Sequence, residues 1–110
     1  MQFFDNDIVR SQSAELMSTY EDLQTLISSH KLRTKEGTEL YLKKMFRLLE
    51  LQEMLYFRAT YSEEGDAKEY IKIINKTFPL VALEDETDPF QTFRRMKSEL
   101  MKLKEQAEKS

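Results

Sequence analysis

The side chains of this chain that could do chemistry are mainly carboxylates, and two pairs have a meaningful spacing. Glu36 with Glu39, and Glu50 with Glu53, both follow the pattern E-x-x-E. At about 100° per residue, all four would lie within one arc of a single helix. Helical enzymes that hydrolyse phosphate compounds hold Mg²⁺ with such pairs, so a carboxylate–Mg phosphohydrolase-like enzyme is one reading, by analogy of fold.

The second reading of these carboxylates is a solvated stripe with local ion pairs, and we favour it. A di-iron site would need Glu-x-x-His pairs on facing helices, but the single histidine, His30, lies outside any such pair. The absence of cysteine excludes thiolate sites. The acidic segment 84–88 lacks the turn glycine of a calcium loop. We therefore predict no catalytic, cofactor-binding or metal-binding residue.

Basic side chains are also grouped, which makes nucleic-acid binding a weaker alternative. They lie on two predicted helices: Lys43, Lys44, Arg47, Arg94, Arg95, Lys97, Lys102 and Lys104. Acidic residues interrupt the second group, and the chain carries 17 Lys and Arg against 20 Asp and Glu. Nucleic-acid binders usually show a stripe of one sign, so we consider binding of nucleic acid unlikely.

Nothing in the chain predicts a membrane segment or an export signal. The longest apolar run, residues 80–83, is far shorter than a spanning helix requires. The first ten residues lack a basic region followed by an apolar one. We expect no association with a membrane and a cytoplasmic location.

Composition predicts one all-α domain spanning residues 1–110. The chain has 110 residues, with 2 Gly and 2 Pro, too few for a turn-rich β fold. It has 14 Leu and 6 Met against 2 Val, which favours helix. We expect a bundle of about four helices around one long central helix.

The first two helices are predicted from capping residues and apolar spacing. One of Asp5, Asn6 and Asp7 should cap the first helix, which should end near residues 28–30. Its apolar stripe is predicted to be Ile8, Leu16, Tyr20, Leu23 and Ile27. The second helix should begin at a Thr34 cap and reach residue 59 or 61. It is the most apolar part of the chain.

The last two helices are shorter or more polar. Ser62 is the predicted cap of the third helix, which Pro79 should end. A connector, 80–87, follows. Asp88 should cap the fourth helix, with Pro89 at its first position. A 3-4 spacing in the fourth helix predicts a buried seam of Phe93, Met96, Leu100, Leu103 and Ala107.

Three segments of the sequence resemble a known family when taken together. They are FFDNDIV at 3–9, TKEGTELYLKKM at 34–45 and FRRMKSEL at 93–100. They resemble a small family of all-helical proteins of cyanobacteria and their phages, known only as a domain of unknown function. The resemblance implies a compact helical protein and carries no activity, substrate or catalytic residue.

The apolar side chains predict a function in protein association. On the second helix they cover an arc of roughly 200°, about twice that of an ordinary surface helix. We therefore predict a non-enzymatic protein-interaction module that self-associates, most simply as a homodimer. The alternative is a monomer in which the 80–83 connector buries Phe46 and Phe57. The candidate interface residues are Phe46, Phe57, Leu42, Leu49, Phe3 and Phe4.

Overall fold

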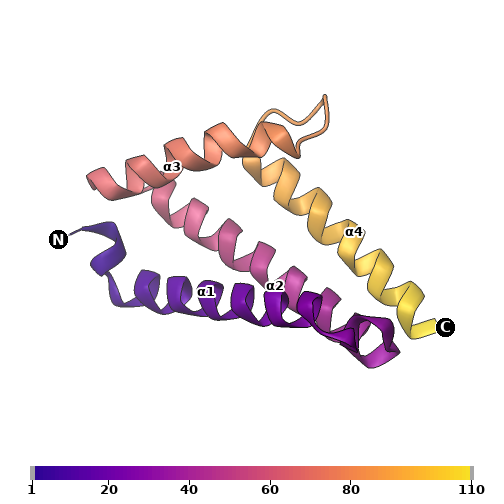
Figure 1. The fold of residues 1–110 in the computed structure, drawn as a ribbon. Helices are drawn as coiled ribbons and strands as arrows, with labels where there is room; N and C mark the ends of the chain where they lie inside the picture. The colour runs from indigo at the N-terminus through magenta and orange to yellow at the C-terminus, as the bar shows by residue number, and fades with distance from the viewer. Residues whose placement is uncertain (1, 110) are drawn as a thin grey trace.

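The computed structural model describes residues 2–109, which form four helices and three short 3-10 turns without any strand (Figure 1). The helices are α1 (Asp7–Ser28), α2 (Lys35–Thr60), α3 (Gly65–Thr77) and α4 (Pro89–Lys109). The turns are η1 (Phe3–Asp5), η2 (His30–Arg33) and η3 (Phe78–Leu80). The predicted all-α fold, with α2 as its long central helix, is confirmed.

Three helix starts follow the predicted caps. The Asn6 side chain accepts from the backbone N–H groups of Ile8 and Val9 at the start of α1. The Thr34 hydroxyl accepts from Gly37 N–H in the first turn of α2, at 3.0 Å. The Asp88 carboxylate accepts from the fourth helix in the same way, at 3.2 Å. Each cap satisfies donors that the helix itself leaves unpaired.

The predicted cap of α3 is wrong. Glu64 holds the N-cap position, and its side chain makes no capping hydrogen bond. The Ser62 hydroxyl instead accepts from the backbone N–H of Glu64, at 3.2 Å, within the turn that joins α2 to α3. Ser62 therefore shapes the turn that precedes the helix, and α3 begins three residues after it.

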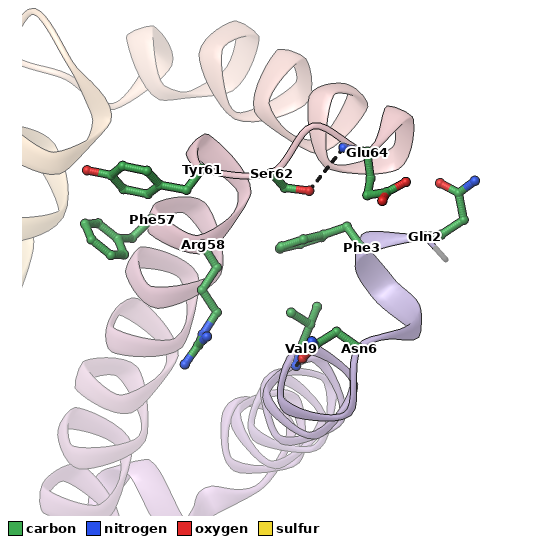
Figure 2. A pocket seen from close by; sticks show the side chains of 9 residues that line it. All are labelled: Gln2, Phe3, Asn6, Val9, Phe57, Arg58, Tyr61, Ser62 and Glu64. Carbon is green, nitrogen blue, oxygen red and sulfur yellow. Dashed lines mark hydrogen bonds between the residues drawn. The ribbon is translucent and has the colours of Figure 1, made fainter.

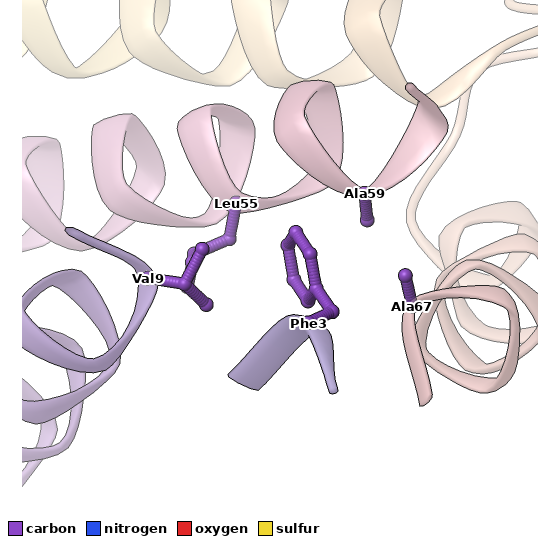
Figure 3. Close-up of a cluster of buried hydrophobic side chains, with 5 residues drawn as sticks. All are labelled: Phe3, Val9, Leu55, Ala59 and Ala67. Carbon is purple, nitrogen blue, oxygen red and sulfur yellow. The ribbon is translucent and has the colours of Figure 1, made fainter. Parts of the chain in front are cut away.

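The core lies along two sides of α2. One cluster joins α2 to η1, α1 and α3 (Figure 3), and its buried members are Phe3, Val9, Leu55, Ala59 and Ala67. The other joins α2 to α4 through Leu49, Tyr56 and Phe93. The molecule measures 47 × 33 × 19 Å, so its thinnest dimension is about two helix diameters. The helices α1, α2 and α4 thus form a thin layer, with α3 packed against one end of α2 (Figure 1).

The buried stripe of α1 differs from the predicted one. The buried residues of α1 are Val9, Thr19, Leu23 and Leu26. Three residues of the predicted stripe, Ile8, Tyr20 and Ile27, are exposed. Only Leu16 and Leu23 of the predicted stripe lie on the inner face of the helix. The true stripe has the same 3-4 spacing, so periodicity alone could not choose between them. Packing of Val9 beside Phe3 sets the rotation of the helix.

The predicted seam of α4 is buried only at its start. Phe93 is buried, Met96, Leu100 and Ala107 are half-buried, and Leu103 is exposed. The prediction that Leu100 is fully buried is therefore wrong. The later turns of α4 pack against one side of α2 alone, because α3 does not reach them.

A carboxylate ties the N-terminal turn to α3. The backbone N–H groups of Phe3 and Phe4 donate to the two oxygens of Asp66, at 2.9 and 3.0 Å. The Phe4 ring meets Tyr70 edge to face at 5.8 Å. Burial of Tyr70 raises the pKa of its hydroxyl to about 12. The first turn of the chain is thus held by both polar and aromatic contacts.

The turn η2 crosses closely over the start of α2. The Thr38 hydroxyl donates to the Leu32 carbonyl oxygen at 2.9 Å. A Cβ atom at Gly37 would overlap the carbonyl oxygen of Lys31, so a residue without a side chain is required there. The turn η2 therefore covers the first turn of α2 on the side of Gly37 and Thr38.

Leu51 should be the most sensitive core position of α2, because its side chain is 0% exposed. We expect Leu51→Ala to lower the free energy of unfolding by about 2–5 kcal/mol in a urea titration. The exposed Ile73 provides the control, and Ile73→Ala should cost less than about 0.5 kcal/mol. Equal losses would show that the core is placed incorrectly.

Acid should release the N-terminal turn. Desolvation raises the pKa of Asp66, but hydrogen bonds from the backbone of Phe4, Phe3 and Ala67 outweigh it and hold the pKa below its ordinary value. This stabilisation is complete above the unfolded pKa and is lost as the pH falls through the folded one. Asp66→Asn should therefore lower the Tm by several degrees at pH 6, and the difference should shrink below pH 3. Glu69→Gln, on an exposed part of α3, should leave the Tm unchanged.

Candidate protein interface

The predicted interface residues do not share one surface. Phe3, Leu42 and Leu49 are buried in the chain's own core, because η1, α4 and their neighbours cover the sides of α2 on which these residues lie. Phe4 and Phe46 are half-buried. Of the six, Phe57 alone is exposed, with 52% of its area accessible. These positions are thus mainly structural within a single chain.

Phe57 belongs to a small aromatic group at the end of α2. Its ring lies 5.0 Å from that of Tyr61 and 6.2 Å from that of Phe90. A hollow of about 490 Å³ lies beside it. In Figure 2 the rings of Phe57 and Tyr61 are turned away from Phe3. Charged side chains interrupt the surroundings of Phe57: Glu53, Arg58, Glu64, Asp88 and Arg94. The apolar surface at Phe57 is therefore narrow.

The connector does not cover Phe57, contrary to the monomer alternative. Leu80 is itself 83% exposed, and the connector lies beside Thr92 and Met96 of α4. Phe90, at the start of α4, provides the ring that packs on Phe57 instead. Both the connector and Phe57 therefore remain at the surface.

Two carboxylates of α2 are engaged by cations of the same chain. Glu53 accepts from Lys97 at 2.9 Å, and Glu50 accepts from Arg47 at 3.5 Å. Arg47 also donates to Glu15, and that hydrogen bond lowers the pKa of the Glu15 carboxyl. No group of three or more Asp, Glu or His side chains with metal-ligand geometry occurs within residues 2–109.

Ion pairs join α2 to both of the long helices beside it. They join α2 to its two neighbours as Arg47 to Glu15, Lys44 to Asp22, and Glu53 to Lys97. Lys43 and Glu50 point to the same side of α2 by helical spacing. Basic residues of both groups predicted from the sequence are thus bound to carboxylates of the same chain.

The opposite side of α2 carries an uncharged stripe. Tyr41, Met45, Leu48 and Gln52 follow a 4-3-4 spacing and lie about 180° from Lys43 and Glu50. The same stripe continues to Tyr56 and Ala59, which α3 covers. At its beginning η2 crosses Gly37 and Thr38. Between η2 and α3, about three turns of α2 run from Tyr41 to Gln52. Leu48 is buried there, and Tyr41, Met45 and Gln52 are half-buried.

Apolar side chains of the flanking helices border this stretch. Tyr20 of α1 and Leu103 of α4 are both 48% exposed. Helical spacing places each of them at the edge of the buried side of its helix. We call this surface the open face, defined by Tyr20, Ile27, Tyr41, Met45, Gln52, Met96 and Leu103. Sequence reasoning missed it because Tyr20, Ile27 and Leu103 were assigned to buried stripes.

The connector at the edge of the open face is apolar and rigidly held. Val81 and Leu83 are exposed like Leu80. The Glu86 side chain, 8% exposed, accepts from the backbone N–H of Leu83 at 2.7 Å and from Arg95 at 2.8 Å. Arg95 also donates to the Val81 carbonyl oxygen at 2.7 Å. The hydrogen bond from Arg95 lowers the pKa of the Glu86 carboxyl, against the opposing effect of burial.

The two ends of the open face carry opposite charges. At one end the connector, which adjoins Leu49 and Gln52, exposes Glu84 and Asp85. At the other end η2 exposes Lys31 and Arg33, and Arg33 lies near Ala107 of α4. The open face therefore has an acidic end and a basic end.

Comparison with known proteins gives the family. A family model described as a domain of unknown function, DUF1825, matches residues 1–107. The chain belongs to the DUF1825 family. The predicted membership of a small family known only as a domain of unknown function is thereby confirmed. No curated protein matches the chain. No solved structure matches it either.

No helix within residues 2–109 of this DUF1825 protein is long and apolar enough to cross a membrane.

Glu86 should control the order of the connector. Glu86→Gln removes the charge that binds Arg95, so we expect the backbone amide of Leu83 to exchange with deuterium about tenfold faster. The exposed neighbour Glu84 gives the matched control, and Glu84→Gln should leave the exchange rate unchanged. An unchanged rate in Glu86→Gln would mean that the connector is ordered by other contacts.

Proposed function

We propose that this DUF1825 protein is a non-enzymatic protein-interaction module that forms a homodimer in the cytoplasm through the open face. The observation that supports this most directly is the difference in length between α2 and α3. The 26 residues of α2 span about 39 Å, whereas the 13 residues of α3 span about 20 Å. Half of the third side of α2 therefore has no covering helix.

The size of the open face suits a protein partner. Three helices about 9 Å apart give a width of roughly 25 Å, and the uncovered length is roughly 20 Å. The area is about 500 Å² before the connector is included. Stable complexes bury about 800 Å² on each partner. The three exposed apolar side chains of the connector bring the surface close to that value.

The composition of the open face also fits a protein interface. Its members include aromatic residues and methionines, which are enriched in interface centres, and none of them is charged. Met45 and Met96 have flexible side chains that adapt to a facing surface. The apolar group around Phe57 is smaller and ringed by charges, so we assign the open face the main role.

A second copy of the chain is the partner that this surface fits best. A two-fold interface uses the same patch on both subunits, and it is the commonest arrangement of soluble oligomers. The open face has opposite charges at its two ends, so an antiparallel copy would place unlike charges together. Lys44, Arg47 and Lys97, in contrast, are already paired with carboxylates within the chain.

Light scattering coupled to size exclusion should test the dimer. The wild-type protein should elute with about twice the 13.1 kDa of one chain at 100 µM. Tyr20→Glu combined with Leu103→Glu should shift it to monomer, because two charges would enter the apolar centre. Both side chains are half exposed, so the variant should keep its helical circular dichroism.

The matched control places the same charges beside the aromatic group. Phe57→Glu combined with Tyr61→Glu changes two exposed side chains off the open face and should leave the dimer intact. A wild-type monomer at 100 µM would overturn the proposal. A dimer that dissociates in the control and persists in the Tyr20 and Leu103 variant would transfer the interface to Phe57.

A further inference from the structure

We infer that, in the dimer, the connector of each copy covers the η2 end of the other copy's open face. This inference rests on the proposed function and specifies its geometry. The exposed side chains of Leu80, Val81 and Leu83 would pack on the uncovered stripe of α2. The acidic residues Glu84 and Asp85 would meet the basic turn η2.

The connector has the properties of a docking element. Exposed apolar loops are usually mobile, but this one is fixed by hydrogen bonds of Glu86 and Arg95 to its backbone at 2.7 Å. Thr92 also donates to Glu86, at 3.1 Å. Burying a carboxylate is costly unless it is paired and hydrogen-bonded, as it is here. An apolar loop held in one shape loses little conformational entropy on binding.

The positions along α2 agree with a two-fold axis near Met45. The connector adjoins Gln52, which lies seven residues after Met45. Near the other end, Thr38 lies seven residues before Met45 and contacts η2. Both distances are about 10 Å along the helix. Rotation by 180° about Met45 therefore brings the connector of one copy to the η2 end of the other.

Charge supports the same register. In an antiparallel pair, Glu84 and Asp85 of one copy approach Lys31 and Arg33 of the other, and the contact occurs twice. A parallel arrangement would place the two acidic connectors together, which costs free energy. Since both charged groups belong to this chain, the surface is complementary to itself and needs no second kind of protein.

Cross-linking between single-cysteine variants should detect this contact, because the chain has no cysteine of its own. Asp85→Cys mixed with Arg33→Cys should give a covalent dimer with a short bis-maleimide reagent. Either variant alone should cross-link poorly, because its two cysteines lie on opposite sides of the axis. Asp85→Cys mixed with Asp7→Cys is the control and should not cross-link. Asp7 begins α1, at the opposite end of the molecule from η2 (Figure 1).

Charge reversal provides a second test in the same register. Glu84→Lys with Asp85→Lys should raise the Kd of the dimer about tenfold, and Lys31→Glu with Arg33→Glu should do the same. All four changes in one chain should restore the Kd to within about threefold of the wild type. These residues are exposed, so the variants should fold normally.

The outcomes separate the two proposals. A wild-type protein that is monomeric at 100 µM would overturn both the dimer and its geometry. A dimer that persists, with no specific cross-link between Asp85→Cys and Arg33→Cys and no rescue by the fourfold reversal, would overturn only the role of the connector. A specific cross-link together with rescue would support the reciprocal arrangement.

Discussion

The structure depends on one constraint, which is that a long apolar helix needs cover along its whole length and around most of its circumference. The apolar residues of α2 face three directions, and the chain has three other helices. Two of them, α1 and α4, are nearly as long as α2 and pack along it. The third, α3, is half as long as α2, so the third direction is covered only toward the C-terminal end of that helix.

Local features set the limits of the uncovered region. Gly37 allows η2 to pass directly over α2, which closes one end. Ala59 and Ala67 are small enough for α3 to approach α2 closely at the other. The buried Glu86 then turns the chain from η3 into α4 and leaves the connector beside the open face. A few small or polar residues thus decide where apolar surface remains exposed.

Much of the fold was predictable because local signals dominate helices. Thr34 and Asp88 marked two helix starts, and Asn6 was one of three candidate caps for the first helix. Their side chains satisfy backbone donors within the same turn. The rotation of α1 was not predictable, because two stripes of equal period compete and only the contact of Val9 with Phe3 chooses between them. Helical spacing alone also led to the wrong prediction that Leu103 is buried, whereas it is exposed.

The candidate interface was less accessible from the sequence for a related reason. Leu42, Leu49 and Phe3 are as apolar as any docking residue, and only the tertiary arrangement shows that the chain covers them itself. Conversely, the hydrogen bonds between Arg95, Glu86 and the connector join residues that no helical period relates. Surfaces left uncovered by a short helix become visible only when the helices are placed in space.

The anchor at Asp66 has a consequence for the order in which the chain acquires its structure. Contacts between α1, η2 and α2 join neighbouring parts of the sequence, so this hairpin can form while synthesis of the chain is still in progress. Phe3, however, is 63 residues from the carboxylate that binds its N–H group. The segment around Phe3 therefore settles only after α3 has been synthesised, because Asp66 and Ala67 belong to that helix.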